Sequence, residues 1–272
     1  MTKEVPEVEN ISLSPITEIR FILKVGDIVT IELTDGSAFS HGWALPPRVP
    51  LRFRDQSFPI STDTGCSLKV NCSYISYYKA PFEELSVVRD IINPIDITHP
   101  PTVFIVGAPS SGKTSLCKLI CNSIYHSVFN QNFPARYPIY VNADPDQAPF
   151  CPPGCISAIP VTSSINNFGF PFTDPLVFMY GSTKVEEKKA PLFISQLKEL
   201  LTHVSERRKF VGSSYGGTVI DFPSVTSKCI FDMLEDAISF AEELCAKNMD
   251  PIQIIVVGND KLYDNIHRLK PG

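Results

Sequence analysis

The stretch Phe104–Ile120, FIVGAPSSGKTSLCKLI, decides the fold of the larger part of the chain. Around the start of this stretch, Val103–Val106 is a short run of β-branched and aromatic residues, which predicts a buried strand. After Ser115, apolar residues recur at helical spacing: Leu116, Leu119, Ile120 and Ile124. Between strand and helix, Gly107–Thr114 reads G-x-x-x-x-G-K-T. A glycine-rich loop in this setting is typical of a phosphate-binding P-loop.

The residue types in this loop fit phosphate chemistry. Gly107 and Gly112 allow backbone angles and a close approach that a side chain would block. The loop N–H groups and the helix N-terminus then point at phosphate oxygens. Lys113 can reach the β- and γ-phosphates, and the Thr114 hydroxyl can ligate Mg²⁺. A chance match in a Gly/Ser loop is disfavoured by the complete motif, so the sequence predicts a site for a nucleoside triphosphate with magnesium.

Composition limits the class of protein. The chain has 272 residues, 43% of them hydrophobic, and a net charge of −5, which fits a globular protein with a sizeable core. This charge excludes a global basic field for nucleic acid but leaves a local basic groove open. None of the eight cysteines forms C-x-x-C, so zinc is not expected. Neither a signal peptide nor a membrane-spanning stretch is visible, and we expect an intracellular protein with reduced thiols and no membrane contact.

The chain reads as two domains with a linker. From about residue 16 to 78, four strand-like runs alternate with turn signals: TEIRFILKV, DIVTIEL, VPLRFRD and CSLKVNCSYI. They predict a small antiparallel β domain, a sandwich or partial barrel. Ala80–Ile92 has helical periodicity, and NPIDITHPP follows as a proline-rich connector.

From Thr102 onward, strand-like runs alternate with amphipathic helices, which predicts a parallel sheet covered by helices. The strand runs are PIYVNAD, PLVFMYG, GTVIDF and IQIIVVG, and the helices are LFISQLKELLTHVSERRK and CIFDMLEDAISFAEELCAK. We therefore expect a β-sandwich domain over residues 1–79 and a linking helix with connector over 80–101. An α/β P-loop NTPase domain, a parallel sheet with helices on both faces, is expected over 102–272.

A second cluster follows the strand run PIYVNAD. Asp144 stands at the carboxyl end of this strand, where α/β folds place their chemistry. Such an aspartate in a P-loop protein helps to hold Mg²⁺ or takes a proton from an attacking hydroxyl, and Gln147 could position a substrate. Asp-Pro-Asp is also good turn chemistry, so we favour function for Asp144 and a turn for Asp146. Pro153-Gly154 is either a plain turn or a close approach of backbone to substrate.

A third cluster, Gly181, Ser182 and Thr183, follows the strand run PLVFMYG. Small hydroxyl residues at that edge suit phosphate or ribose contacts. An ordinary helix N-cap by Ser182 or Thr183 explains the same residues equally well. Both interpretations stay open from the sequence.

These segments, taken in order, resemble the eukaryotic polynucleotide 5′-hydroxyl kinases that include the Clp subunit of pre-mRNA cleavage factor. The similar segments cover almost the entire chain: TEIRF, IELTDGSA, TGCS, GAPSSGKTS, YVNADPDQ, PPGCISA, PLVFMYGST and DKLYDNIHRLKP. Members of that family transfer the γ-phosphate of ATP, with Mg²⁺, to the 5′-hydroxyl of RNA or DNA. Other members have lost the reaction and remain as ATP-bound subunits of the cleavage and polyadenylation machinery.

The resemblance implies roles for individual residues. Asp144 would be the catalytic carboxylate beside the substrate hydroxyl, and Glu18 matches an N-terminal glutamate that contacts the nucleotide. The phosphates would be held by Ser110, Ser111, Gly112, Lys113, Thr114 and Ser115. The resemblance also implies ATP and Mg²⁺ as cofactors, a nuclear location, and a role in pre-mRNA 3′-end processing. Its expected partners are subunits of the cleavage and polyadenylation machinery and, for a working kinase, an RNA 5′ end.

Two departures from the family pattern bear on activity. Active members carry Thr-x-Gly-Trp after the strand that GTVIDF resembles, and that tryptophan clasps the P-loop lysine. Here Phe222–Val225 reads FPSV, which implies that control of Lys113 is missing. The chain also stops at Gly272, before the place of the family's arginine-bearing lid and C-terminal domain. We therefore expect an ATP-binding protein with weak or absent phosphoryl transfer, the alternative being an active 5′-hydroxyl kinase. A generic P-loop ATPase or GTPase fits the β domain and the Asp-x-x-Gln segment less well.

Overall fold

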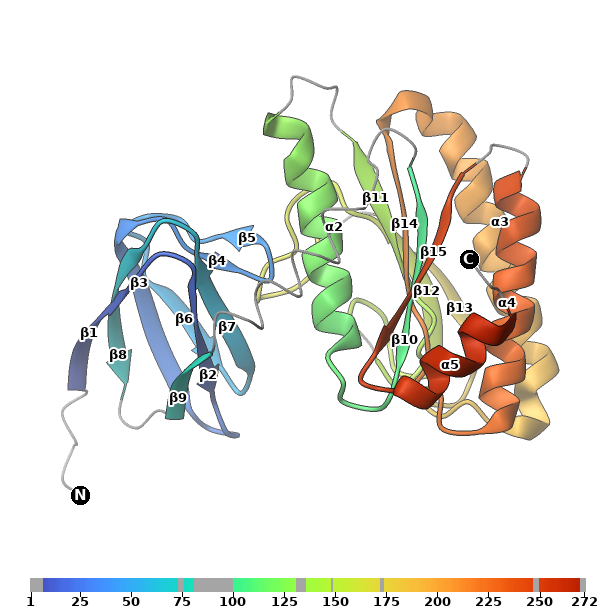
Figure 1. Ribbon diagram of the computed structural model, residues 1–272, viewed down its shortest axis with the longest axis horizontal. Helices are drawn as coiled ribbons and strands as arrows, with labels where there is room; N and C mark the ends of the chain where they lie inside the picture. The colour runs from blue at the N-terminus through green and yellow to red at the C-terminus, as the bar shows by residue number, and fades with distance from the viewer. Residues whose placement is uncertain are drawn as a thin grey trace. The chain divides into compact units, whose positions relative to one another are not determined.

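The computed structural model describes residues 7–72, 76–80, 100–130, 136–147, 149–171, 174–246 and 250–269. The chain divides into two compact units (Figure 1). One takes Met1–Pro94 and Asn166–Phe168, and the other takes Ile95–Ile165 and Gly169–Gly272. The linking helix and connector expected over 80–101 lie outside the described residues, except that Ala80 ends a strand and residues 100 and 101 precede the next one.

The first unit consists of two antiparallel sheets. Their strand orders are β1-β8-β3-β6 and β5-β4-β7-β2-β9. The strands are β1 (Glu7–Leu13), β2 (Thr17–Ile22), β3 (Ile28–Gly36), β4 (Phe39–Ser40), β5 (Trp43–Ala44), β6 (Leu51–Arg54), β7 (Ser57–Thr62), β8 (Cys66–Cys72) and β9 (Ser76–Ala80). The β-sandwich expected from the sequence is thereby confirmed.

Alternation explains why these strands form a sandwich. In β2, Ile19 and Phe21 are fully buried while Arg20 between them is not, so one face of the strand turns to the core. Phe53 and Phe58 stack in that core with ring centroids 4.1 Å apart. Strand β1 was not expected, because only the last two apolar residues of its polar sequence, Ile11 and Leu13, are buried.

A short segment distant in sequence also belongs to the first unit. Asn166–Phe168 lies between two strands of the other unit along the chain. The Phe168 ring stacks on Phe53 at 5.4 Å and meets the edge of Trp43 at 6.1 Å. No local pattern in the sequence indicates this contact.

The second unit is built on one sheet with the strand order β13-β12-β11-β14-β10-β15. Its strands are β10 (Thr102–Gly107), β11 (Tyr137–Asn142), β12 (Cys155–Pro160), β13 (Leu176–Met179), β14 (Tyr215–Asp221) and β15 (Ile252–Val257). Strands β15, β10, β14 and β11 are mutually parallel, but β12 and β13 are antiparallel to their neighbours.

The parallel sheet expected from the sequence is thus mixed and mostly parallel, with β12 and β13 as its antiparallel strands. Between β11 and β12 no described residue is helical, and a short connection returns a chain antiparallel to the strand it left. No strand was expected at Cys155–Pro160, although every residue of β12 is buried. Its apolar run is too short to distinguish a buried strand from a loop by periodicity.

Helices cover both faces of this sheet, as expected. They are α2 (Lys113–Asn130), α3 (Ala190–Val211), α4 (Lys228–Ala246) and α5 (Asp260–Leu269), with 3₁₀ turns at Glu187–Lys189 and Gly212–Ser214. Figure 1 shows α2 on one face and the pair α3 and α4 on the other. In the parts of the chain that the structure describes, no helix is long and apolar enough to cross a membrane.

Parallel strands bring their carboxyl ends to one edge of the sheet. Strand β10 ends at Gly107, β11 at Asn142 and β14 at Asp221, and these three strands are neighbours. In register, Asn142 lies beside Asp221. Side chains that are far apart in the sequence therefore meet at this edge, where α/β proteins bind their ligands.

Candidate functional site

The P-loop joins the end of β10 to the start of α2. A side chain at Gly107 would place its Cβ 2.2 Å from the carbonyl oxygen of Val257 in β15, so only glycine fits. Gly112 has a φ of +93°, and Ser110 also lies in the left-handed region with a φ of 56°. The predicted close approach at Gly107 is thus an approach to a neighbouring strand. Ser115 is exposed in the first turn of α2.

Thr114 and Asp221 form a hydrogen-bonded pair beneath this loop. The Thr114 hydroxyl donates a hydrogen bond to Oδ2 of Asp221 at a distance of 2.5 Å. Asp221 is 1% exposed, and burial raises the pKa of its carboxyl to about 6. Hydrogen bonds from Thr114 and Tyr140 act in the opposite direction and lower this pKa. Its other oxygen, Oδ1, is buried without a hydrogen-bond partner among the described residues. A buried carboxylate oxygen that lacks a donor fits a cation ligand.

Asp221 was missed by the sequence analysis, which grouped Thr114 with Asp144 as metal ligands. In the structure the Thr114 hydroxyl reaches Asp221 instead of Asp144. The sequence contained a signal for Asp221, because it directly follows the apolar residues Val219 and Ile220 of a strand-like run, much as Asp144 follows the run PIYVNA. Only the sheet order shows that β14, and not β11, lies next to the P-loop strand.

Asp144 follows β11 and is half-buried. Burial raises the pKa of its carboxyl, while a backbone hydrogen bond from Asp146 and the positive charge of Lys113 oppose the rise. Oδ1 of Asp144 accepts the Asp146 N–H at 3.1 Å, and the Gln147 N–H donates to the Asp144 carbonyl at 3.1 Å. Asp144 therefore takes part in the turn, and its role as a catalytic carboxylate or metal ligand stays a prediction.

The turn that carries Gln147 is tied to the sheet. The Nδ2 group of Asn142 donates to the Gln147 carbonyl at 2.7 Å, and Asn142 Oδ1 is buried without a partner among the described residues. Asp146 and Gln147 themselves are exposed. A role of Gln147 in positioning a substrate stays a prediction.

Lys113 is nearly buried and already has partners. Its ammonium group donates to Ser224 Oγ at 2.8 Å and to the Ala108 carbonyl at 3.2 Å. Ser224 belongs to the FPSV stretch, whose Val225 N–H donates to the Gly107 carbonyl at 3.1 Å. The expectation that this stretch leaves Lys113 without control is corrected, because a serine hydroxyl contacts the lysine here.

The loop with Gly181, Ser182 and Thr183 is hydrogen-bonded to the loop after Asp144 at Gly154. The N–H groups of Tyr180 and Gly181 both donate to the Gly154 carbonyl at 2.9 Å. Gly154 has a φ of +86° and its own N–H donates to the Pro145 carbonyl at 2.9 Å. Pro153-Gly154 is thus a turn that joins two loops.

Ser182 and Thr183 do not cap the following helix. Helix α3 begins at Ala190, well beyond both residues. The Ser182 hydroxyl instead accepts the Lys184 N–H at 3.3 Å and donates to Glu186 at 2.8 Å, while Thr183 is exposed. The N-cap alternative is therefore excluded, and a substrate contact of Gly181, Ser182 and Thr183 stays a prediction.

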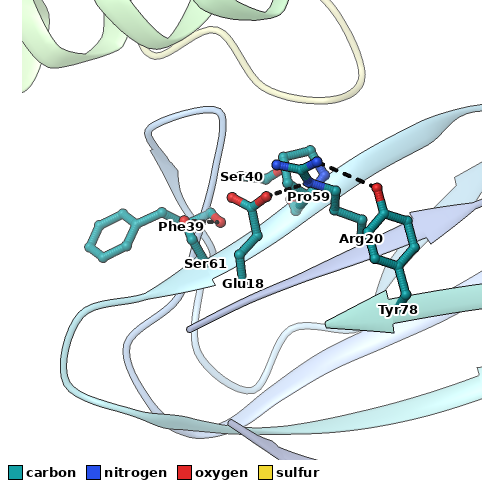
Figure 2. Close-up of polar contacts among 7 residues, drawn as sticks. All are labelled: Glu18, Arg20, Phe39, Ser40, Pro59, Ser61 and Tyr78. Atoms are coloured by element: carbon teal, nitrogen blue, oxygen red, sulfur yellow. Dashed lines mark hydrogen bonds and ion pairs between the residues drawn. The ribbon is translucent and has the colours of Figure 1, made fainter. Parts of the chain in front are cut away.

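Glu18 lies in the first unit, on the face of β2 opposite Ile19 and Phe21. Figure 2 shows its carboxylate beside Arg20, whose Nε donates to Glu18 Oε1 at 2.6 Å. The Arg20 guanidinium extends on to the Tyr78 hydroxyl at 3.4 Å and lies 5.9 Å from that ring's centroid (Figure 2). Glu18 is a buried, paired carboxylate on strand β2, and its contact with a nucleotide stays a prediction.

No cluster of three or more His, Cys, Asp or Glu side chains that could hold a metal ion occurs within the described ranges. Thr114 and Asp221 would offer one hydroxyl and one carboxylate to a cation. That arrangement suits Mg²⁺, which keeps several waters and binds through one or two carboxylates together with phosphate oxygens.

The strand, glycine-rich loop and helix, with Lys113 in the loop and the hydrogen bond from Thr114 to the buried Asp221, define a P-loop protein. The chain matches the family described as "mRNA cleavage and polyadenylation factor CLP1 P-loop" over residues 107–271, and "N-terminal beta-sandwich domain of polyadenylation factor" over residues 12–93. The chain therefore belongs to the CLP1 family. The family resemblance inferred from the sequence is confirmed.

Curated relatives carry the same name. A "mRNA cleavage and polyadenylation factor CLP1" of Phaeosphaeria nodorum is 27% identical over 93% of this chain and 56% of its own length. The one from Scheffersomyces stipitis is 30% identical over 66% of this chain and 39% of its own length. "Protein CLP1 homolog" of Brugia malayi is 23% identical over 97% and 61%, respectively. The chain thus spans roughly two-fifths to three-fifths of the length of these relatives.

A solved structure supports the fold. The chain is similar to Clp1p in "Structure of wild-type Clp1p-Pcf11p (454 -563) complex", with a TM-score of 0.74 and 20% identity, covering 97% of this chain and 72% of that one. At this level of identity the similarity shows the fold alone. It confirms a β-sandwich unit and a P-loop unit in one chain.

Proposed function

We propose that this chain binds ATP with Mg²⁺ and acts as a nucleotide-bound factor in nuclear pre-mRNA 3′-end processing. The hydrogen bond from Thr114 to the buried Asp221, beneath a complete P-loop, is the observation that carries the nucleotide part. The names of the CLP1 relatives support the process. The solved complex of Clp1p with Pcf11p supports other cleavage-factor subunits as partners.

The described side chains fit such a ligand. The N–H groups of Ser110–Ser115 and the Lys113 ammonium would bind phosphate oxygens. Thr114 and Asp221 would hold Mg²⁺, whose charge neutralises the phosphates when it is bound. Ser111 Oγ and Asp221 Oδ1 are among the buried oxygens without hydrogen-bond partners in the described residues, and a ligand at this site would supply such partners.

Lys113→Ala is expected to lose most of the affinity for ATP. The substitution removes the one ammonium group of the loop, and a buried charge-assisted hydrogen bond contributes about 1.5–3 kcal/mol, which corresponds to roughly a 10- to 100-fold weaker Kd. Isothermal titration with ATP and Mg²⁺ measures this change. Lys198→Ala is the matched control, since Lys198 on α3 makes a surface ion pair with Asp236 on α4. Equal affinities of wild type and Lys113→Ala would contradict the assignment.

A second candidate function is phosphoryl transfer to a 5′-hydroxyl. The raised pKa of the Asp144 carboxyl and its position near the Lys113 charge favour this chemistry, because a carboxylate with a raised pKa is a better general base. In that case Asp144 would accept the proton of the substrate hydroxyl. Gln147 and Gly181–Thr183 would lie along the substrate, an RNA 5′ end.

Glu18 is proposed to take part in nucleotide binding, as the family resemblance implies. ATP with Mg²⁺ is then expected to slow hydrogen exchange of backbone amides in β2 and β9 as well as in the P-loop. Mass spectrometry of exchange with and without ATP measures this, with Glu18→Gln as the variant that loses the β-strand protection. Protection confined to residues after Thr102 would exclude the β-sandwich from nucleotide binding.

A further inference from the structure

Tyr140 is a buried tyrosine that touches the candidate cation site. It lies in β11 and is fully buried. Its hydroxyl donates to Oδ2 of Asp221 at 3.1 Å. Two rings fix the orientation of the tyrosine, Phe170 with a centroid distance of 4.7 Å and Phe150 at 6.2 Å.

The hydrogen bonds at Asp221 are unevenly distributed between its two oxygens. Oδ2 receives both the Thr114 hydroxyl and the Tyr140 hydroxyl, whereas Oδ1 is buried and receives no donor within the described residues. Rotation about the χ2 torsion of an aspartate has a broad energy minimum, so a carboxylate with a single hydrogen bond can rotate and exchange the positions of its two oxygens. Two donors from different elements, α2 and β11, restrict that rotation and leave Oδ1 as the oxygen without a partner.

We propose that Tyr140 is a positioning residue for the metal site, whose hydroxyl holds Asp221 so that Oδ1 stays available to a divalent cation. This inference rests on the proposed binding of nucleotide with Mg²⁺. Groups that hydrogen-bond to a ligand residue orient it, and their loss typically costs 10- to 100-fold in metal affinity. Tyr140 acts through Asp221 and needs no contact with phosphate or metal.

A purely structural role makes a different prediction. Buried hydroxyls need a hydrogen-bond partner in any case, and Tyr140 could satisfy this need without influence on a cation. Removal of the hydroxyl would then change stability but not the dependence of nucleotide binding on Mg²⁺. The ratio of nucleotide affinities with and without Mg²⁺ separates the two roles.

The test is titration of the full chain with a fluorescent ATP analogue, once in Mg²⁺ and once in EDTA. Tyr140→Phe keeps the ring packed against Phe150 and Phe170 and removes only the hydroxyl. Its affinity is expected to fall about tenfold in Mg²⁺ and to stay unchanged in EDTA. Tyr215→Phe is the matched control, because it removes another buried hydroxyl, 2.6 Å from Thr218 Oγ1, at the opposite end of β14 from Asp221.

The outcomes separate the inference from the proposed function. A wild type that binds the analogue no better in Mg²⁺ than in EDTA overturns the proposed magnesium site and the inference with it. A wild type that depends on Mg²⁺, with Tyr140→Phe indistinguishable from it, overturns the inference alone. Tyr140→Met is the second variant in case Phe does not fold, since any side chain without a hydroxyl is expected to show the same loss. An equal loss in Tyr215→Phe would show a general packing effect and also overturn the inference.

Discussion

Asp221→Asn is expected to abolish the contribution of Mg²⁺ to nucleotide binding and, at the same time, to stabilise the nucleotide-free protein at neutral pH. Asparagine has nearly the same shape and still accepts hydrogen bonds from Thr114 and Tyr140. It lacks the negative charge with which a carboxylate attracts Mg²⁺. It also removes a carboxylate that is 1% exposed, whose ionisation in the folded state is unfavourable.

The effect on stability depends on pH in a defined direction. The pKa of Asp221 rises from 3.8 to about 6, so between these two values the folded protein keeps a proton that the unfolded chain has released. The unfolding free energy therefore falls as pH rises through this window, and the loss is complete above it. A rise in pKa of this size corresponds to roughly 3 kcal/mol. The unfolding free energy of Asp221→Asn should therefore exceed that of wild type by about 1–3 kcal/mol at pH 7.5 and differ little from it at pH 4.

Urea denaturation in EDTA at both pH values measures this gain, and ATP titration with and without Mg²⁺ measures the loss of function. Asp236→Asn is the control, because Asp236 is exposed and makes a surface ion pair with Lys198. Its stability is expected to stay within about 0.5 kcal/mol of wild type at both pH values. A gain for Asp221→Asn that is equal at both pH values would contradict a buried, ionising Asp221. Unchanged magnesium dependence would remove Asp221 from the metal site.

The 272-residue chain is expected to phosphorylate 5′-hydroxyl RNA poorly or not at all. Lys113 donates to Ser224 Oγ and to the Ala108 carbonyl, and phosphate would have to replace these contacts. The Thr-x-Gly-Trp stretch that active members of the family carry is also replaced by FPSV in this chain. A phosphoryl transfer that proceeds without an arginine at the moving group is slower by about 10³–10⁵, which corresponds to roughly 4–7 kcal/mol of barrier.

Transfer of radiolabelled γ-phosphate to a 5′-hydroxyl oligonucleotide measures this reaction. Asp144→Asn is the control, since it removes the candidate base and keeps the turn at Asp146 and Gln147. A rate near the background of Asp144→Asn supports a nucleotide-bound factor without kinase activity. Robust turnover by wild type that disappears in Asp144→Asn would show a working polynucleotide kinase, and the second candidate function would replace the first.

Local sequence alone determined both classes of unit. The strand–glycine loop–helix pattern around Gly107–Thr114 depends on residues that are adjacent in the chain, so it could be recognised without a structure. The β-sandwich was equally visible, because alternation in β2, β3, β6 and β8 reports which face of each strand is buried. Ordered segments across the chain also indicated the CLP1 family, which the family matches confirmed.

Tertiary structure decided which side chains meet. Thr114 bonds to Asp221, 107 positions away, and Lys113 bonds to Ser224, 111 positions away. Both contacts exist because β14 lies next to β10 in the sheet, and strand order follows from long-range packing that no local pattern encodes. The same reason explains why β12 returned antiparallel and why Asn166–Phe168 joined the sandwich. The sequence thus determined that a P-loop motif is present, and the order of the strands determined that Asp221 lies beside Thr114.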